Sequence, residues 1–244
     1  MINNNLILNV YEKKTLKSKI STQLLYGEKF SIIRKYKDCL KIKSSYDKYI
    51  GYISKKKYLT KINPTHKVSV LKADLYSKPN KKFKLKKKIS FCSHIEVIDI
   101  KNSFYKFEKY WIKKENVLKL NDKIKLFNKV KIFKDVKYKW GGNSFKGIDC
   151  SALVQIFYKF NNKYCPRDTK DQIKFFKKNQ KIKHLKKNSL IYWKGHVAIC
   201  LSNTYLIHAY GPKKKVLIMK INKTVKEIKN NSKLEVQSII NESN

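Results

Sequence analysis

The strongest constraint on the fold is a glycine-rich stretch that runs directly into an apolar segment. Three of the chain's seven glycines, Gly141, Gly142 and Gly147, lie within the ten residues before Cys150. Clustered glycines mark loops in which the backbone turns tightly or approaches a ligand closely. The residues from Ala152 to Phe160 are apolar with few gaps. This pattern predicts a helix that is buried over most of its circumference.

Cys150 is expected in the first turn of that helix. Unpaired N–H groups and the positive end of the helix dipole favour a thiolate over a thiol at this position. A free cysteine more often packs as a small apolar side chain. The glycine-rich loop and the polar neighbours Asp149 and Ser151 favour a nucleophile here.

The net charge of +41 raises the hypothesis of a nucleic-acid or membrane partner. Nearly all of this charge is lysine, and Arg34 and Arg167 are the only arginines. Recognition of phosphates and bases favours the planar guanidinium of arginine. The lysines are spread along the whole chain, which is typical of solvated faces. We therefore expect no specific nucleic-acid partner, and Arg167 stands out as a candidate functional residue.

The sequence gives little sign of export. Residues 1–10 lack the basic segment, apolar core and cleavage site of a signal peptide. No stretch approaches the ~18 apolar residues of a transmembrane helix, so we expect a cytoplasmic protein without membrane insertion. Five cysteines without a C-x-x-C pair indicate reduced thiols and neither disulfides nor a structural zinc site.

The first half of the chain predicts two small β modules, in residues 1–62 and 65–120. Short alternating runs are separated by turn residues from Thr22 to Leu59, and the next 60 residues or so repeat this plan. Residues 51–59 align without gaps on residues 110–118, and Asn63-Pro64 interrupts any strand between the modules. The phrases Y-G-E-x-F and Y-I-G-Y-I resemble those of bacterial SH3-like domains. A single β domain of seven or more strands is the alternative.

Residues 122–244 predict a third domain of the α+β class. A helix is expected over residues 122–136, ahead of the glycine-rich loop, and the Cys150 helix follows that loop. Thr169 with Gln172 has the capping-box pattern, which predicts a second helix from about Lys170. The pattern then predicts four strands: 190–193, 195–201, 204–210 and 215–221.

Two histidines lie on the strands of a predicted hairpin. If the turn is centred on Ser202, then His196 and His208 are directly opposite each other and point to one face. A thiolate needs a base beside it, and the base needs a third polar group to fix its tautomer. Two hydrogen-bonded core histidines are one alternative. A Cys-His-His zinc site is another, although no fourth ligand has metal-like spacing.

Four motifs resemble those of the NlpC-type papain-like cysteine peptidases of bacteria and occur in the order found in that family. They are Y-x-W-G-G-x(4)-G-x-D-C-S-A-L-V-Q, then P-R-D-T-x-x-Q, then W-K-G-H-V-A-I, then L-I-H-A. The resemblance covers residues 122–240 or so. It implies a papain-like peptidase domain behind the two SH3-like β-barrels.

The resemblance implies a role for each matching residue. Cys150 would be the nucleophile, His196 the base and His208 the residue that orients it, while Tyr49 would reach the active site from the first SH3-like module. The predicted substrate-binding residues are Asp149, Ser151, Thr169, Trp140, Arg167 and Glu28. Lysine or serine occupies the region before Thr22, where the family usually has an acid that holds the substrate's amino terminus. Glu28 and Asp149 are the possible substitutes.

Taken with the missing signal peptide, the resemblance implies a γ-D-glutamyl-L-diamino-acid endopeptidase. Such an enzyme cleaves short murein peptides through a thioester during cell-wall peptide recycling and needs no cofactor or metal. Two rival hypotheses stay open at this point. One is a basic module that binds nucleic acid or an anionic wall polymer with an idle catalytic centre. The other is an acyltransferase that uses the same cysteine and histidine.

Overall fold

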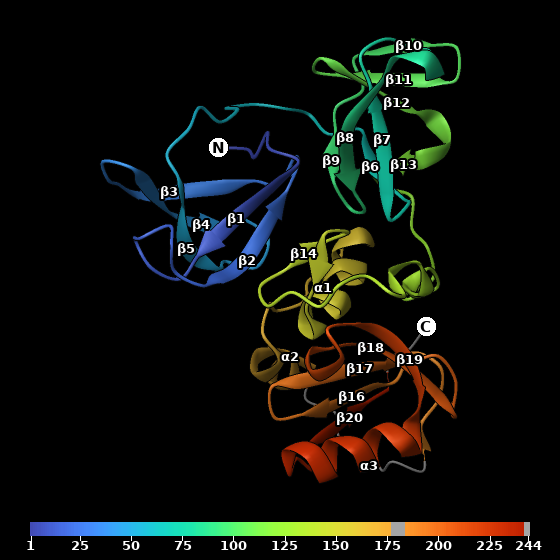
Figure 1. Cartoon of the computed structure of the whole chain (residues 1–244). Coiled ribbons are helices and arrows are strands. Elements are labelled where there is room, and N and C mark those ends of the chain that lie inside the picture. The colour runs from blue at the N-terminus through green and yellow to red at the C-terminus, as the bar shows by residue number, and fades with distance from the viewer. Residues whose placement is uncertain (177–183, 242–244) are drawn as a thin grey trace. The chain divides into compact units, whose positions relative to one another are not determined.

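The computed structural model describes residues 1–176 and 184–241, which form two units (Figure 1). The first unit comprises residues 1–123 together with 140–145, and the second comprises 124–139 together with 146–244. Within the described residues, no helix is long and apolar enough to cross a membrane.

A five-stranded antiparallel sheet in the order β2-β1-β5-β4-β3 opens the first unit. Its strands are β1 (Ile7–Tyr11), β2 (Ile20–Leu25), β3 (Phe30–Lys35), β4 (Cys39–Ser44) and β5 (Ile50–Ser54). The apolar positions of the alternating runs point inward, and Val10, Phe30, Ile42 and Ile53 belong to one buried cluster. This cluster is the core of the first β-barrel.

A second barrel follows, with two sheets in the orders β10-β11-β12-β7-β8 and β13-β6-β9. Its elements are β6 (His66–Val68), β7 (Lys72–Tyr76), η1 (Lys81–Phe83), β8 (Lys84–Ser90), β9 (His94–Ile95), β10 (Asp99–Lys101), β11 (Phe104–Phe107), β12 (Tyr110–Lys113), η2 (Lys114–Asn116) and β13 (Val117–Lys119). The barrel has its own buried cluster, which includes Leu75, Ile89 and Ile112. The two clusters agree with two barrels, while the division into domains 1–62 and 65–120 stays a prediction.

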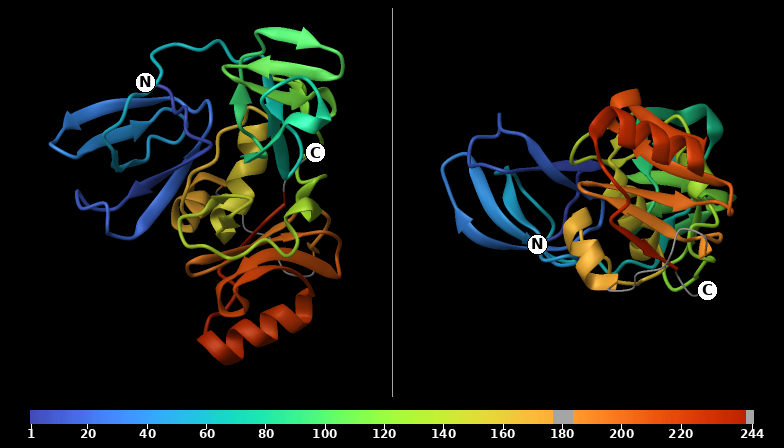
Figure 2. Two further views of the ribbon diagram at one scale, coloured as in Figure 1. Left: turned by 45° about the horizontal axis from the view of Figure 1, so that its top comes forward. Right: turned by 90° about the horizontal axis from the view of Figure 1, so that it is seen from below.

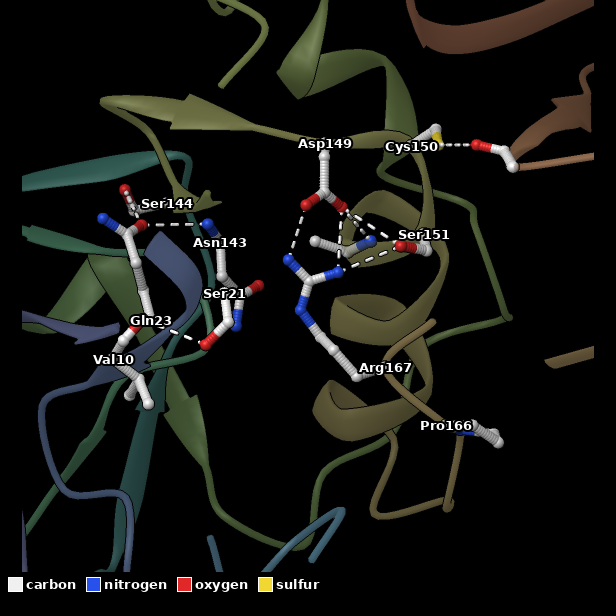
Figure 3. A network of polar contacts seen from close by, with 12 residues as sticks. Val10, Ser21, Gln23, Asn143, Ser144, Asp149, Cys150, Ser151, Pro166 and Arg167 are labelled. Atoms are coloured by element: carbon white, nitrogen blue, oxygen red, sulfur yellow. Dashed lines mark hydrogen bonds and ion pairs between the residues drawn. The ribbon is translucent and has the colours of Figure 1, made fainter. Parts of the chain in front are cut away.

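The glycine-rich segment 140–145 belongs to the first unit and is held on strand β2. The side-chain oxygen of Gln23 accepts hydrogen bonds from the backbone of Asn143 at 2.9 Å and from the hydroxyl of Ser144 at 3.1 Å (Figure 3). Gly141 has φ +67°, and a Cβ atom there would lie 2.3 Å from the carbonyl oxygen of Ile20. The segment, with β14 (Asn143–Ser144), therefore requires glycine where it approaches β2.

The second unit is built on a five-stranded antiparallel sheet in the order β19-β18-β17-β16-β20. Its strands are β16 (Leu190–Trp193), β17 (His196–Cys200), β18 (Tyr205–Tyr210), β19 (Lys215–Lys220) and β20 (Ser238–Ile240). The first four confirm the strands expected from sequence. The unit also contains η3 (Val130–Phe133), β15 (Gly147–Ile148) and η5 (Gly211–Lys213).

Helices cover both faces of this sheet (Figures 1 and 2). Helix α1 (Cys150–Phe160) contacts β17 and β18, and all its residues are buried. On the other side lies α3 (Ile221–Ser232), whose Ile221 and Ile228 share a buried cluster with Trp193 of the sheet. These layers confirm the predicted buried helix at Cys150 and the α+β class.

Two local expectations are wrong. Residues 122–136 form turns and the short η3 in place of a helix, because Phe127 and Asp135 have φ values of 59° and 65° that break a helical run. Helix α2 (Thr169–Phe176) does form near the expected start. Its Gln172 makes no capping box, since the side-chain oxygen accepts from the hydroxyl of Tyr192 and the amide nitrogen donates to the carbonyl oxygens of Ser151 and Pro166.

Candidate active site

Cys150 is the first residue of α1, and Asp149 is the N-cap. The Asp149 backbone is extended, and its Oδ1 atom accepts a hydrogen bond of 2.9 Å from the backbone N–H of Ala152. This bond satisfies one of the free donors of the first turn. The local sequence D-C-S-A therefore both starts the helix and fixes the thiol at its N-terminus.

The thiol lies against the beginning of strand β17. Its sulfur is 3.9 Å from the carbonyl oxygen of Gly195, to which the thiol donates (Figure 3). The backbone N–H of Val197 also donates to this sulfur. Because Gly195 and Val197 flank His196, the fold places the cysteine beside the backbone of the predicted base.

The side chains of His196 and His208 are in direct contact. Nε2 of His196 lies 2.9 Å from Nδ1 of His208, and Tyr210 stacks on His208 with ring centroids 4.7 Å apart. The expected register is wrong. Ile199 pairs with Ile207, so His208 lies two residues along the strand from the position opposite His196. The hydroxyl of Ser202 accepts from the N–H groups of Thr204 and Tyr205, which shifts the turn by one residue. Both histidines still lie on one face, because the shift preserves the alternation of the strands.

Burial dominates the electrostatics of the site. Desolvation raises the pKa of the Cys150 thiol to about 12, with a further increase from the charge of Asp149. Desolvation lowers the pKa of His196 to about 4 and that of His208 to about 2. These shifts favour a neutral thiol and neutral imidazoles at pH 7, against the thiolate that the helix dipole favours.

Asp149 and Arg167 form a buried ion pair beside the thiol. Two nitrogens of the guanidinium lie 2.6 and 3.0 Å from the two carboxylate oxygens, and Nη1 also donates to the hydroxyl of Ser151 at 3.0 Å (Figure 3). The positive charge of Arg167 lowers the pKa of Cys150 and partly offsets Asp149. Arg167 therefore neutralises the acid that the helix start requires.

Tyr138 is the first residue of the Y-x-W-G-G motif, and no role was predicted for it. Its backbone is fixed by a hydrogen bond from its N–H to the carbonyl of Lys214. Burial and the charges of Cys150 and Asp149 raise the pKa of its hydroxyl. Tyr138 therefore keeps its proton and can donate a hydrogen bond. Its place in the Y-x-W-G-G motif was the available signal.

The remaining predicted site residues lie in several elements. Thr169 is half-buried at the start of α2, and its role stays a prediction. Trp140 is 63% exposed and, with Ser18, Lys19 and Ile20, lines a pocket of about 560 Å³ in the first unit.

Glu28 and Tyr49 also lie in the first unit. The Glu28 carboxylate accepts a hydrogen bond of 2.6 Å from the backbone of Leu25. Tyr49 precedes β5, and its N–H donates to Asp47. Their predicted parts in the reaction stay predictions.

Two further residues were missed. Gln172 is fully buried and accepts a hydrogen bond from Tyr192, which ties α2 to the sheet in addition to its bonds to Ser151 and Pro166. Met219 contacts His208, with its sulfur 3.3 Å from Nε2. Gln172 belongs to the P-R-D-T-x-x-Q motif but was assigned only to helix capping, whereas Met219 lies outside the four motifs. Among the described residues, no group of three His, Cys, Asp or Glu side chains is arranged to hold a metal ion.

Comparison with known families finds two matches in this chain. Residues 135–231 match the NlpC/P60 family, and residues 10–57 match the bacterial dipeptidyl-peptidase SH3 domain. A structure of an NlpC/P60 family protein from Bacillus cereus ATCC 10987 has the same fold, with a TM-score of 0.81 at 20% identity and 98% coverage of both chains.

Two characterised relatives are similar in sequence. Dipeptidyl-peptidase 6 from Lysinibacillus sphaericus is 39% identical over 72 residues, which are 30% of this chain and 27% of that protein. Gamma-D-glutamyl-L-lysine dipeptidyl-peptidase from Bacillus subtilis (strain 168) is 24% identical over 236 residues, covering 85% of this chain and 78% of the relative. These matches confirm the NlpC/P60 domain, the SH3 domain, the fold class and the peptidase class expected from the motifs.

Proposed function

We propose that this chain, which contains an NlpC/P60 domain and a bacterial dipeptidyl-peptidase SH3 domain, is a cysteine peptidase of short murein peptides. The bond it cleaves would be the amide between γ-D-glutamate and a diamino acid, which is the bond type in the name of the Bacillus subtilis relative. The observation that carries the proposal is the thiol of Cys150 against the two residues that flank His196, with His208 bonded to that histidine.

The reaction would begin from the neutral pair. The sulfur of Cys150 attacks the carbonyl carbon of the γ-glutamyl group while His196 takes the thiol proton, so no free thiolate has to form first. The imidazolium of His196 then gives this proton to the leaving amine of the diamino acid. A thioester remains on Cys150. Water, deprotonated by His196, attacks the thioester and releases the glutamyl carboxylate and the thiol.

The tetrahedral intermediates carry a negative oxygen that needs donors. The backbone N–H of Cys150 is at the start of α1, where helices leave donors unpaired. Tyr138 offers a protonated hydroxyl, whose pKa responds to the charge of Cys150. We assign these groups to the oxyanion, and Tyr49 stays a further candidate. In other acyl-transfer enzymes one such donor contributes about 3 to 4 kcal/mol.

The amino-terminal side of the substrate is proposed to involve the pocket lined by Lys19 and Trp140. Trp140 offers an exposed apolar ring, and Lys19 forms no ion pair with any residue in the described part of the chain. A lysine ammonium does not attract a substrate's free ammonium group. We therefore propose that peptides with a blocked amino terminus are accepted alongside free ones. The five free cysteines fit the reducing cytoplasm as the place of action.

The proposal is tested by mixing the protein with L-Ala-γ-D-Glu-L-Lys and with the meso-diaminopimelate peptide in water enriched in ¹⁸O. Mass spectrometry should detect L-Ala-γ-D-Glu that carries one ¹⁸O atom, and the Cys150→Ala variant should release none. Appearance of a new amide with an added amine, without ¹⁸O uptake, would instead identify an acyltransferase. Release of other fragments would refute the assigned bond.

A further inference from the structure

Met219 on β19 makes the last contact in a chain of side chains that starts at His196. Its pairing partner across the ladder is Leu206, so Met219 and His208 lie on the same face of neighbouring strands. The thioether sulfur lies 3.3 Å from Nε2 of His208, and Nδ1 of His208 lies 2.9 Å from Nε2 of His196. His208 is fully buried and stacked on Tyr210, with an angle of 13° between the ring planes.

The chemistry of the thioether decides where the protons of this chain are. A thioether sulfur has no hydrogen and can only accept. Nε2 of His208 must therefore carry the hydrogen, and because a neutral imidazole has only one, Nδ1 of His208 is an acceptor. Nε2 of His196 then donates to it. The unprotonated nitrogen of His196 is Nδ1. In the opposite arrangement a lone pair of His208 would face the lone pairs of sulfur.

We propose that Met219 is a positioning residue that fixes the tautomers of His208 and His196, so that Nδ1 of His196 is the nitrogen able to take the thiol proton. The consequence for catalysis rests on the proposed function, whereas the tautomers themselves do not. A neutral hydrogen bond is worth about 0.5 to 1.5 kcal/mol. Its loss should therefore change the populations of the two tautomers measurably.

The chain is well suited to a direct test, because Met1 and Met219 are its only methionines. The protein is labelled with ¹⁵N-histidine, and long-range ¹H–¹⁵N spectra at pH 7 identify the protonated nitrogen of each ring. We expect His196 and His208 both as the Nε2–H form. Replacement of methionine by norleucine exchanges the sulfur for a methylene group of similar shape, and Met219→Leu confines the change to one position. Both should shift His208 toward a mixture with the Nδ1–H form.

Activity provides the second readout. Met219→Leu should lower kcat roughly 3- to 10-fold with little change in KM. Met219→Gln, whose amide oxygen can accept from Nε2, should recover most of that loss. Unchanged tautomers and kcat in both the norleucine protein and Met219→Leu would overturn the inference and leave Met219 a packing residue. Expected tautomers in a protein without peptidase activity would refute the proposed function and leave the inference standing.

Discussion

The sulfur of Cys150 lies 3.9 Å from the carbonyl oxygen of Gly195, the residue directly before His196. A thiol that donates to a carbonyl is protonated, and burial raises the pKa of this one to about 12. We infer that the resting site holds a neutral thiol against the backbone that flanks His196, whose imidazole is also neutral. The charged pair of many cysteine peptidases would then form only as the substrate is attacked.

The first prediction follows from this resting state. Alkylation of Cys150 by iodoacetamide should be slow at pH 7 and should accelerate up to about pH 12 without a plateau, because the thiolate is the reacting form. Site-resolved mass spectrometry measures the rate at each pH. Cys200, whose pKa burial also raises to about 12, serves as the internal control. A plateau of the Cys150 rate below pH 8 would contradict the neutral resting pair.

The second prediction concerns stability in mild acid. Burial lowers the pKa of His196 to about 4 and that of His208 to about 2, whereas both titrate near 6.5 when unfolded. The unfolded chain thus binds more protons below pH 6.5, and stability rises with pH across this window. We expect denaturation between pH 7 and 5 to show a loss of about 1 to 2 kcal/mol per histidine. His208→Asn should remove that histidine's share of the pH dependence, and an equal slope in the variant would refute the assignment.

The buried ion pair gives the third prediction. Arg167→Met leaves the charge of Asp149 uncompensated and should lower the free energy of unfolding by about 3 to 5 kcal/mol. Adding Asp149→Asn should restore part of the loss, because the unpaired charge is gone. Arg34→Met changes the only other arginine, which is exposed, and should have little effect. Urea denaturation measures all three, and equal stability of the two single variants would show that the pair is not structural.

The fourth prediction addresses the pocket lined by Lys19 and Trp140. Lys19→Glu should lower KM for L-Ala-γ-D-Glu-L-Lys roughly 2- to 5-fold relative to the N-acetylated peptide, since an exposed charge pair is worth up to about 1 kcal/mol. Lys17→Glu makes the same charge change at a nearby exposed residue that is not part of the lining. If the ratio of KM for the free peptide to KM for the N-acetylated peptide is the same in the two variants, Lys19 has no part in substrate selection.

Much of the architecture could be predicted because local patterns agree with the final fold. The glycine-rich loop and the apolar run after Cys150 identified α1, and short apolar runs identified β16 to β19. Residues 122–136 misled us because Ile124, Phe127 and Val130 have helical spacing, while the left-handed φ of Phe127 depends on its buried packing against Phe157 and Tyr158. Tertiary contacts overrode the local pattern there.

Cys150 and the two histidines could be proposed as a catalytic group from motifs, but the details of their arrangement could not. Moving the centre of the hairpin turn by one residue changes the pairing by two residues and leaves every side chain on the same face. The apolar pattern therefore cannot show whether Ala198 or His196 is the partner of His208. The pKa of Cys150 depends on burial by residues distant in sequence. The role of Met219 depends on which nitrogen of His208 its sulfur contacts. Neither is visible in a linear motif.

The most direct test of the central claim is hydrolysis of L-Ala-γ-D-Glu-L-Lys in ¹⁸O water, with Cys150→Ala and His196→Ala as matched variants. The account predicts that the wild-type protein releases lysine and L-Ala-γ-D-Glu with one ¹⁸O atom, and that both variants lose at least about 1000-fold in rate. Cleavage at the same rate by Cys150→Ala, or no cleavage by the wild type while its thiol is intact, would contradict a Cys150 peptidase.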